Sequence, residues 1–407
     1  MRRYGSTRKP TRPDAVGEFR PRLPGDGDHA AWADDLPVFL CGLLGAMSFW
    51  STALAEAAGL LVIVASPVRL LIAGGRDAMQ FCRTRASRIA FIFFGVYSAL
   101  VAVSYLVAPG PFHRNPSLLW HPLLFPALLI PAVRRATLIR AAKIFLAGGA
   151  ASAVVTLLLN FRGREAGGPV TFTGLTTFAD LLALCAVTGL VIGLRRKPFR
   201  LASWPLAACA LVLPAVAWSG ERAPIVALAG AGTARAARAG PRFLLAWLGV
   251  AVACAAFTSP TFTEKMGWML RGGSVDRYVV WNEGLKLVPG TPLLGYGPGS
   301  FAGILPAEAW GRFVQRPPWS WHDDMLETWL DSGPLAALAL AGLLVVGVVQ
   351  AVRGMIAARE GRVSVSGEAG LLFILLVLFG MVGSVVTTSV LGLVFWALLG
   401  MTLNPPE

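Results

Sequence analysis

His322 is the residue of this sequence whose type best suits acid–base chemistry at neutral pH. It lies in the segment RPPWSWHDDMLETWLDSGP, where Ser320 and Asp323 resemble a capping box, so we expect a helix to begin at Trp321. The dipole at the start of a helix disfavours an imidazolium, whereas the carboxylates of Asp323 and Asp324 favour one. A neutral His322 could remove a proton from a hydroxyl as a general base. The alternative is a histidine at the membrane boundary that makes only a structural hydrogen bond.

Arginines in two other segments have the chemistry to bind an anion. Arg222 lies in WSGERAP directly after Glu221, and Arg162 and Arg164 lie between glycines in NFRGREAGGPV. A guanidinium donates two parallel hydrogen bonds to phosphate oxygens, so each arginine is a candidate phosphate ligand. Arg222 also fits an arginine that only extends toward the lipid headgroups. The sequence does not distinguish Arg162 from Arg164 as a ligand.

A carboxylate and a glycine-rich segment complete the candidates. Asp180 lies near the start of an apolar run, where a carboxylate is either functional or paired, here with Arg162 or Arg164. The segment DRYVVWNEGLKLVPGTPLLGYGPGSF begins beside Arg277 and ends in three alternating glycines. These glycines lack the strand–turn–helix context of a nucleotide fingerprint, and instead predict a turn that lets the backbone approach the membrane or a ligand.

The elements that must position these residues are predominantly apolar. Charged residues make up 14% of the 407 residues, against about 25% in soluble proteins. Hydropathy windows of about 19 residues predict an all-α, polytopic membrane protein with about twelve spans. One of these, 223–234, is too short to cross a membrane alone, so we expect it either to continue into the arginine-rich segment after it or to lie in a thinned region of the bilayer. The predicted spans are 36–51, 53–73, 88–107, 117–133, 141–159, 175–194, 201–218, 223–234, 243–258, 334–352, 370–386 and 388–403.

The distribution of basic residues predicts the orientation of these spans. Most of the 36 Lys and Arg residues lie in every second gap between apolar runs, which favours a cytoplasmic location for those gaps and for both termini. The net charge of +14 therefore indicates membrane-flanking loops rather than a nucleic-acid partner. The chain divides into a flexible basic tail (1–35), nine spans (36–258), one long outer loop rich in aromatic residues and folded onto the membrane surface (259–333), and three further spans with a short tail (334–407).

Several other classes of site are not indicated by the residue pattern. The five cysteines form neither a disulfide framework nor a zinc pattern, and we expect them to be small packing residues. The sequence has no HExxH motif, Cys/His cluster or acidic metal box, so we expect no metal and no other cofactor. No internal repeat is visible, which weighs against a transporter built from repeats.

The order of the motifs resembles the bacterial O-antigen ligase and polymerase superfamily. Strong similarity covers roughly 218–335, and the hydropathy pattern matches over about 36–403. The combination is typical of the superfamily and less specific for the ligase within it. The resembling pieces are Gly220–Arg222 in a short outer turn, Arg277–Trp281 and Pro292–Phe301 in the long loop, and His322–Gly333 at the end of that loop.

The resemblance implies a GT-C-like, inverting and metal-independent glycosyltransferase of the bacterial inner membrane, with its active site facing the periplasm. The donor would be an O-antigen linked to undecaprenyl pyrophosphate, and the acceptor a sugar hydroxyl of the lipid A–core oligosaccharide. We expect a monomer surrounded by membrane lipids.

The resemblance also implies roles for individual residues. His322 would be the catalytic base, and Arg222 would bind the diphosphate, together with Arg162 or Arg164 and with Arg277. Two residues depart from the superfamily pattern: Glu221 stands where a small or polar residue is usual, and Asp323 where asparagine is commoner. We expect four further residues to support the site: Asp180, Asp323, Trp281 and Tyr296.

Three alternative functions stay open at this stage. A polymerase of the same superfamily would use the same chemistry with a second lipid-linked glycan as acceptor. A protein O-oligosaccharyltransferase would transfer the glycan to a pilin or a similar protein. A transporter of lipid-linked glycans or anions would need no catalytic base at all.

Overall fold

The computed structural model describes residues 28–72, 84–107, 117–129, 135–161, 175–194, 203–219, 221–255, 275–310, 320–359 and 365–403. Every regular element in these ranges is a helix, which confirms the all-α class for this part of the chain. The helices are α1 (Asp28–Met47), α2 (Thr52–Ile72), α3 (Arg85–Val107), α4 (Ser117–Trp120), η2 (His121–Leu123), α5 (Leu124–Leu129), α6 (Arg135–Phe161), α7 (Leu175–Gly193), α8 (Trp204–Ser219), α9 (Arg222–Ala239), α10 (Pro241–Ala255), α12 (Val275–Leu287), η3 (Val288–Gly290), α13 (Phe301–Ile304), α14 (Ala307–Trp310), α15 (Asp324–Ser332), α16 (Pro334–Arg359), α17 (Val365–Gly380) and α18 (Ser389–Thr402).

Apolar helices of membrane-spanning length are present among these elements. Four, within α3, α6, α7 and α16, are long and apolar enough to cross a bilayer. Eight shorter apolar segments of 10–17 residues lie at the positions of the other predicted spans. These lengths and this composition indicate a helical membrane protein.

Two of the shorter predicted spans are helical with modified limits. The run 117–133 is divided into α4, η2 and α5, because Pro122 begins a 3₁₀ turn in its middle. The run 223–234 is part of α9, which continues to Ala239 through the arginine-rich segment. The predicted continuation of this short run is therefore confirmed.

The predicted span 370–386 is wrong at its C-terminal end. Helix α17 ends at Gly380, and residues 381–388 form turns. Two backbone N–H groups of this turn donate to the carboxylate of Asp324 in α15 instead of to helical carbonyls. Val385 and Val386 are buried, and the apolar residues of this turn continue the apolar run of α17, so its composition resembles that of a span.

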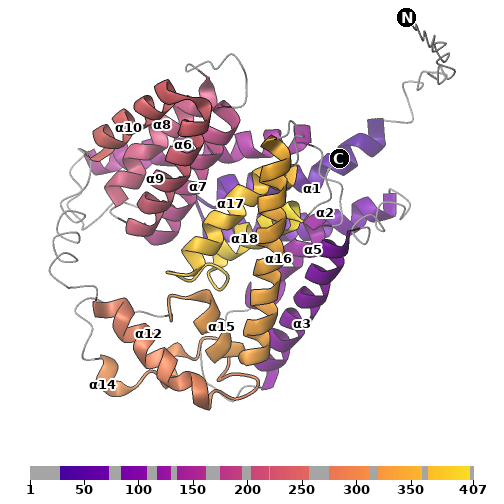
Figure 1. Cartoon of the computed structure of the whole chain (residues 1–407). Helices are drawn as coiled ribbons and strands as arrows, with labels where there is room; N and C mark the ends of the chain where they lie inside the picture. Colours follow the sequence, from indigo (N-terminus) through magenta and orange to yellow (C-terminus); the bar gives the residue numbers. More distant parts are fainter. Residues whose placement is uncertain are drawn as a thin grey trace, which may run out of the picture.

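Helix α18 forms the centre of the bundle. Every residue from Val390 to Thr402 is buried, and the helix packs against α2, α5 and α17, as Figure 1 shows around its yellow ribbon. Helix α7 is similarly enclosed among α6, α8 and α9. Three cysteines, Cys41, Cys185 and Cys209, are free and buried in this apolar packing, as predicted for them.

Small residues allow the helices of the bundle to approach closely. A Cβ atom on Gly42 of α1 would lie 2.6 Å from the Cα atom of Ala141 in α6. A Cβ atom on Gly148 of α6 would lie 2.7 Å from the Cα atom of Ala46. Backbone contacts of this kind are typical of helices that pack within a bilayer, where small residues replace the hydrophobic driving force.

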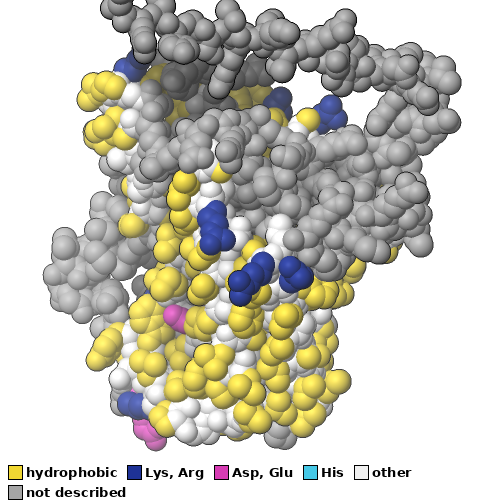
Figure 2. All heavy atoms as spheres, turned by 45° about the vertical axis from the view of Figure 1, so that its right-hand side comes forward, with side chains coloured by type: hydrophobic (Ala, Val, Ile, Leu, Met, Phe, Trp, Pro, Cys, Tyr) yellow, Lys and Arg dark blue, Asp and Glu magenta, His cyan; other side chains and the backbone are white. Residues whose placement is uncertain are grey.

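Helices α3 and α16 each have a basic end and an end that contacts the long loop. Arg85 and Arg88 begin α3, and Arg353 lies near the end of α16. At the opposite end of α3, the hydroxyl of Ser104 donates to the carbonyl of Asp331 in α15 at 2.9 Å. In Figure 2, hydrophobic side chains cover the lower part of the described surface, and basic side chains lie above them. Exposed apolar residues on the two helices include Phe91, Ile92, Val96, Leu338, Val345 and Val349.

The described parts of the loop 259–333 fold into a compact unit. Helices α12, α14 and α15 gather at the bottom of Figure 1, beside the ends of α3 and α16. This unit has a hydrophobic core of its own, and the predicted place of the loop on the membrane surface stays a prediction. The core residues are Val279, Val280, Phe301, Leu305, Ala309, Trp321 and Leu330.

Candidate functional site

His322 lies immediately before α15 and not within its first turn. The side chain of Asp323 is the N-cap of this helix and accepts a backbone N–H of the first turn at 2.8 Å. The predicted helix start at Trp321, with Ser320 as the cap, is therefore wrong. The reason is local: Asp is as good a cap as Ser, and Asp323 has the extended backbone that a cap requires.

The backbone of His322 is in the left-handed region, with φ at +54°, and no other described non-glycine residue has a positive φ. Such a conformation costs free energy and is held only by surrounding structure. The preceding residue, Trp321, helps to fix this conformation, because its side chain is fully buried and its ring centroid lies 4.8 Å from that of Phe301. Strain of this kind is concentrated at active sites and ligand sites.

Burial and the positive charge of Arg277 lower the pKa of His322 to about 4. The imidazole is therefore neutral at pH 7 and has a lone pair available for a proton. From the sequence alone the direction of the pKa shift of His322 was open, because the helix dipole lowers this pKa and the carboxylates of Asp323 and Asp324 raise it. In the folded chain, desolvation lowers the pKa of His322 most, and the charge of Arg277 in α12 lowers it further.

Charged residues from three helix ends converge near His322. Asp180 of α7 interacts electrostatically with Glu221, the N-cap of α9, and with Arg277 of α12. Arg277 in turn acts on His322. Asp180 is 5% exposed, and its Oδ1 atom has no hydrogen-bond partner among the described residues. The structure thus brings together four segments that sequence reasoning selected separately.

Three predicted phosphate ligands are not fully described by the structure. Arg222 is the first residue of α9, directly after Glu221, so its backbone lies at the edge of the converging charges. The prediction for the side chain of Arg222 lies outside the described residues, as do the predictions for Arg162 and Arg164.

The predicted supporting residues hold the backbone around the site. The indole N–H of Trp281 donates to the carbonyl of Trp321 at 3.1 Å, so α12 fixes the peptide directly before His322. The hydroxyl of Tyr296 donates to the carbonyl of Gly290 at 3.2 Å. Trp281 is thereby a direct neighbour of the histidine segment, whereas Tyr296 stabilises the glycine-rich turn.

The glycine-rich turn approaches α15. Its three alternating glycines have φ values between +71° and +105°. The N–H of Tyr296 donates to the carbonyl of Leu330 at 2.7 Å, and the N–H of Gly297 donates to that of Asp331 at 3.0 Å. A Cβ atom on Gly295 would clash with the backbone of Asp331. The turn thus makes a close backbone approach to the C-terminal end of α15, and the predicted approach to the membrane or a ligand stays a prediction.

Three carboxylates on one face of α15 were missed by sequence reasoning. Asp324, Glu327 and Asp331 are spaced three and four residues apart, which places them on the same side of a helix, and they are 5%, 7% and 5% exposed. Burial raises the pKa of each above the ordinary value of a carboxyl group, and for Asp324 and Glu327 a neighbouring carboxylate raises it further. The sequence does contain a signal that could have identified them, namely acidic residues at this spacing directly before an apolar span.

Two of these carboxylates connect α15 to neighbouring backbone. Asp324 accepts the N–H groups of Val385 and Val386 through its Oδ1 atom, both at 2.9 Å. Asp331 accepts the N–H of Gly299 at 2.9 Å and the hydroxyl of Ser300 at 2.7 Å. These bonds join the turn 381–388 and the glycine-rich turn to the same helix, and so stabilise the platform on which His322 lies.

The third carboxylate, Glu327, accepts hydrogen bonds from hydroxyl groups. Ser384 donates to its Oε2 atom at 2.6 Å, and Thr387 is a second hydroxyl partner. The Oγ atoms of Ser384 and Ser320 are 2.9 Å apart, and the Oγ atom of Ser320 lies 3.5 Å from the Nδ1 atom of His322. A continuous series of polar atoms therefore joins Glu327 to the imidazole.

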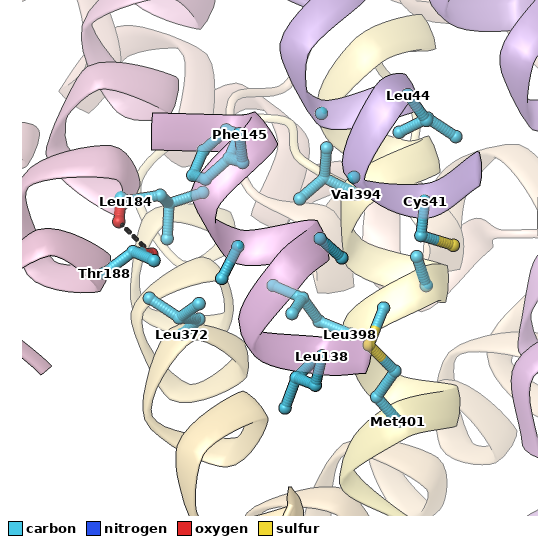
Figure 3. Close-up of a pocket in the computed structure, with 15 residues that line it drawn as sticks. Cys41, Leu44, Leu138, Phe145, Leu184, Thr188, Leu372, Val394, Leu398 and Met401 are labelled. Carbon is cyan, nitrogen blue, oxygen red and sulfur yellow. Dashed lines mark hydrogen bonds between the residues drawn. The ribbon is translucent and has the colours of Figure 1, made fainter. Parts of the chain in front are cut away.

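Neither a metal cluster nor the apolar pocket of the bundle is part of this site. Within the described ranges, no group of three or more His, Cys, Asp or Glu side chains could hold a metal ion. A pocket between α1, α6, α7, α17 and α18 (Figure 3) is lined by apolar side chains such as Phe145, Leu398 and Met401, and by Thr188, whose hydroxyl donates to the carbonyl of Leu184. None of the candidate site residues lines it.

Comparison of the sequence with protein-family models and with curated proteins finds no match. The function must therefore be argued from the residues and their geometry.

Proposed function

We propose that the protein is a GT-C-like glycosyltransferase with twelve spans, and specifically an O-antigen ligase. It transfers a glycan from undecaprenyl pyrophosphate to a sugar hydroxyl of the lipid A–core oligosaccharide at the periplasmic face of the inner membrane. The observation that carries this proposal is the convergence of a neutral, strained His322 with Arg277, Asp180 and Glu221. The motif resemblance supplies the class of donor and acceptor.

The proposed role of His322 is that of the general base. Its imidazole is neutral at the pH of the periplasm because burial and Arg277 hold its pKa low. The Nε2 atom accepts the proton of the acceptor hydroxyl while the hydroxyl oxygen attacks the anomeric carbon. Because one displacement occurs at that carbon, the configuration of the glycan is inverted.

The proposed role of the arginines is to stabilise the leaving group. As the bond between the anomeric carbon and the pyrophosphate breaks, its electron pair goes to the phosphate oxygen. Arg277 is close enough to act electrostatically on His322, so a phosphate held by Arg277 would place the anomeric carbon near the base. Arg222, at the start of α9, and Arg162 or Arg164 complete the set of diphosphate ligands in this proposal. Fixed cations around a developing negative charge contribute strongly to catalysis, because they stabilise the transition state without having to reorient.

Asp180 and Glu221 fit this arrangement as counter-charges of the arginines. Both carboxylates belong to the same electrostatic group as Arg277. Before the donor binds, they reduce the repulsion between the guanidinium groups and keep them in place. The residue Glu221, which departs from the superfamily pattern, therefore has a role that does not require direct contact with the diphosphate.

The position of the basic residues supports the periplasmic location. The long loop lies at the ends of α3 and α16 that are opposite to Arg85, Arg88 and Arg353. Since basic residues flank spans on the cytoplasmic side, the site around His322 faces the other compartment. This orientation also agrees with both termini being cytoplasmic.

A transfer assay tests the proposal. Purified protein in detergent is mixed with undecaprenyl pyrophosphate carrying a glycan of defined length and with rough lipopolysaccharide, and the products are separated on a gel. We expect a lipopolysaccharide band shifted by one whole glycan. Lengthening of the donor with unchanged lipopolysaccharide would instead establish a polymerase. If neither product forms in a folded preparation, the proposal is wrong, and transport or transfer to a protein becomes the better hypothesis.

A further inference from the structure

Glu327 and His322 are joined by two serine hydroxyls that come from different parts of the chain. Ser320 belongs to the end of the long loop, and Ser384 to the turn 381–388. We propose that Glu327 is the terminal residue of a proton relay, which runs from His322 through Ser320 and Ser384 and takes up the proton that His322 removes from the acceptor hydroxyl. This inference rests on the proposed function, because it requires His322 to act as a base.

The hydrogen bonds of the relay have a defined direction when Glu327 is ionised. Ser384 lies 2.6 Å from the Oε2 atom of Glu327 and donates its only proton to it. The 2.9 Å contact between the two serines has the geometry of a bond donated by Ser384 to Ser320, which fits the state with protonated Glu327. Because Ser384 has one proton, this bond must reverse when Ser384 donates to ionised Glu327. Ser384 then accepts from Ser320, and Ser320 accepts from the Nδ1 atom of His322, at 3.5 Å. Nδ1 thus carries the proton, and Nε2 keeps the free lone pair that a base needs. The longest link, at Nδ1, is the one expected to shorten when the imidazole gains positive charge.

The proton transfer balances without any further reactant. The acceptor O–H bond breaks as its oxygen bonds to the anomeric carbon, and the proton goes to Nε2 of His322. The Nδ1 proton moves to Ser320, the proton of Ser320 moves to Ser384, and that of Ser384 moves to Glu327. At the end Glu327 is a neutral acid, both serines are unchanged, and His322 is neutral with its proton on Nε2. The relay resets when Nε2 releases its proton to solvent and Glu327 returns its proton through Ser384 and Ser320 to Nδ1.

The surroundings of the two ends favour transfer toward Glu327. Burial and the nearby carboxylate of Asp331 raise the pKa of Glu327 to about 8, whereas burial and Arg277 lower the pKa of His322 to about 4. The groups that face Glu327 are Asp323, Asp324 and Asp331 on its own helix, Tyr97 of α3, and the hydroxyls of Ser384 and Thr387. Because three of these are carboxylates, a proton on Glu327 also relieves their mutual repulsion.

The other two buried carboxylates of α15 do not have this connection. Asp324 accepts two backbone N–H groups, which cannot pass a proton on. Asp331 accepts a backbone N–H and the hydroxyl of Ser300, and neither bond leads to His322. Ser300 and Ser384 therefore form a matched pair: each hydroxyl donates to a buried carboxylate of α15, and only Ser384 belongs to the relay.

The first test compares the pH profiles of Glu327→Gln, Ser384→Ala and Ser300→Ala in the transfer assay. When Glu327 is protonated, the chain of bonds reverses and Nε2 carries the proton. Because the pKa of Glu327 is raised to about 8, only the fraction of the protein with ionised Glu327 has a free Nε2 at pH 7, so the wild-type kcat should rise from pH 7 through pH 8 as that fraction grows. In Glu327→Gln and Ser384→Ala we expect kcat to fall by roughly 10²-fold, the rise with pH to disappear, and KM for the donor to stay unchanged. Ser300→Ala should keep the wild-type profile.

The second test does not depend on activity. The chain has four histidines, so ¹⁵N-histidine labelling combined with His322→Asn assigns the imidazole signals of His322 by NMR. We expect the proton of neutral His322 to be on Nε2 at lower pH and on Nδ1 at higher pH, in a single step. This change of tautomer should be lost in Glu327→Gln and Ser384→Ala and kept in Ser300→Ala.

The two tests separate the relay from the proposed function. Suppose that the tautomer of His322 changes in a way that depends on Glu327, but the protein has no transferase activity. This result would support the hydrogen-bond series and contradict the proposed glycosyltransferase function. Active wild-type protein whose pH profile and tautomer are unaffected by Glu327→Gln would overturn the relay and leave the transferase intact. Glutamine has the shape of glutamate and can still accept from Ser384, so a purely structural role of Glu327 predicts this second result.

Discussion

The two ends of α15 use buried carboxylates for different purposes. At the C-terminal end, Asp331 accepts a backbone N–H and the Ser300 hydroxyl, and its carbonyl accepts two further donors. Toward the N-terminal end, Glu327 accepts the hydroxyls of Ser384 and Thr387, and Ser384 connects through Ser320 to His322. A buried carboxylate is costly unless its oxygens are paired, and both are. The difference is that the hydroxyl partner of Asp331 leads to no base, whereas that of Glu327 leads to His322.

This difference separates a structural end of the helix from a chemical one. Substitutions near Asp331 should lower the stability of the loop without abolishing the dependence of transfer on pH. Substitutions near His322 and Glu327 should change the rate or its pH dependence and leave the fold in place. Variants at each end can therefore test this division.

The largest effect is expected for His322→Asn. Asparagine tolerates the positive φ of this position better than other residues do, so the backbone before α15 is retained, but an amide cannot accept a proton at neutral pH. We expect the transfer rate to fall by about 10²–10⁴-fold, the range of general-base catalysis. The rate is measured in the gel assay, and the midpoint of thermal unfolding should change little. Transfer at the wild-type rate would show that His322 is not the base.

A smaller loss is expected for Arg277→Gln. This change removes the cation that acts on His322 and Asp180, and we expect the transfer rate to fall by about 10²–10³-fold. The pKa of His322 should also rise toward its ordinary value, because one of the two causes that lower it is gone.

Lys286→Gln is the matched control for the change at Arg277. Lys286 lies on the same helix, is 59% exposed and pairs with Glu283 at 2.8 Å. The charge of Lys286 is not among the groups that act on His322 or Asp180, so this variant should retain its activity, although the buried Glu283 loses this partner. Equal losses in both variants would mean that the net charge of α12, rather than the place of Arg277, matters.

At the other end of α15 the expected effect is on stability. Asp331→Leu leaves the N–H of Gly299 and the hydroxyl of Ser300 without their acceptor, which costs about 1–3 kcal/mol of unfolding free energy for each donor that stays buried. Asp331→Asn should cost much less, because an amide oxygen can accept the N–H and the Ser300 hydroxyl can accept from the amide. Thermal unfolding in detergent measures the difference. Because the Asp331 carboxylate is one of the groups that raise the pKa of Glu327, the rise of kcat with pH should move to lower pH in both variants and should not disappear. Loss of the rise with pH in Asp331→Asn would break the comparison.

The sequence predicted the apolar helices and selected several of the converging residues as candidates, because both follow from local patterns. Hydropathy located each apolar segment, and the types and places of His322, Arg277 and Asp180 marked them as candidates before their proximity was known. The start of α15 was placed wrongly because Ser320 and Asp323 are both acceptable caps, and only the folded backbone distinguishes them.

The partners of Glu327 could not be predicted from local patterns. Ser384 is 57 residues away from Glu327 in sequence, and it lies in an apolar segment that is typical of a span. The turn 381–388 exists because its N–H groups find the carboxylate of Asp324, which is a tertiary contact. A neutral serine in an apolar run has no local feature that identifies it as part of a hydrogen-bond chain.

The smallest effect is expected for Trp281→Phe. This change removes the hydrogen bond from the indole to the carbonyl of Trp321 at 3.1 Å, while an aromatic ring remains. A single hydrogen bond contributes about 0.5–1.5 kcal/mol, so the loss of positioning at His322 can lower the transfer rate by about tenfold at most. Trp329→Phe is the control, because the indole N–H of Trp329 has no hydrogen-bond partner among the described residues.

The two tryptophan variants show whether α12 positions His322 through this bond. If Trp281→Phe is slower and Trp329→Phe is not, the bond to the peptide before His322 contributes to catalysis. Equal rates would mean that the buried side chain of Trp321 alone holds the strained backbone. A loss as large as that of His322→Asn would place Trp281 in contact with the substrate, and the chemical end of α15 would then extend onto α12.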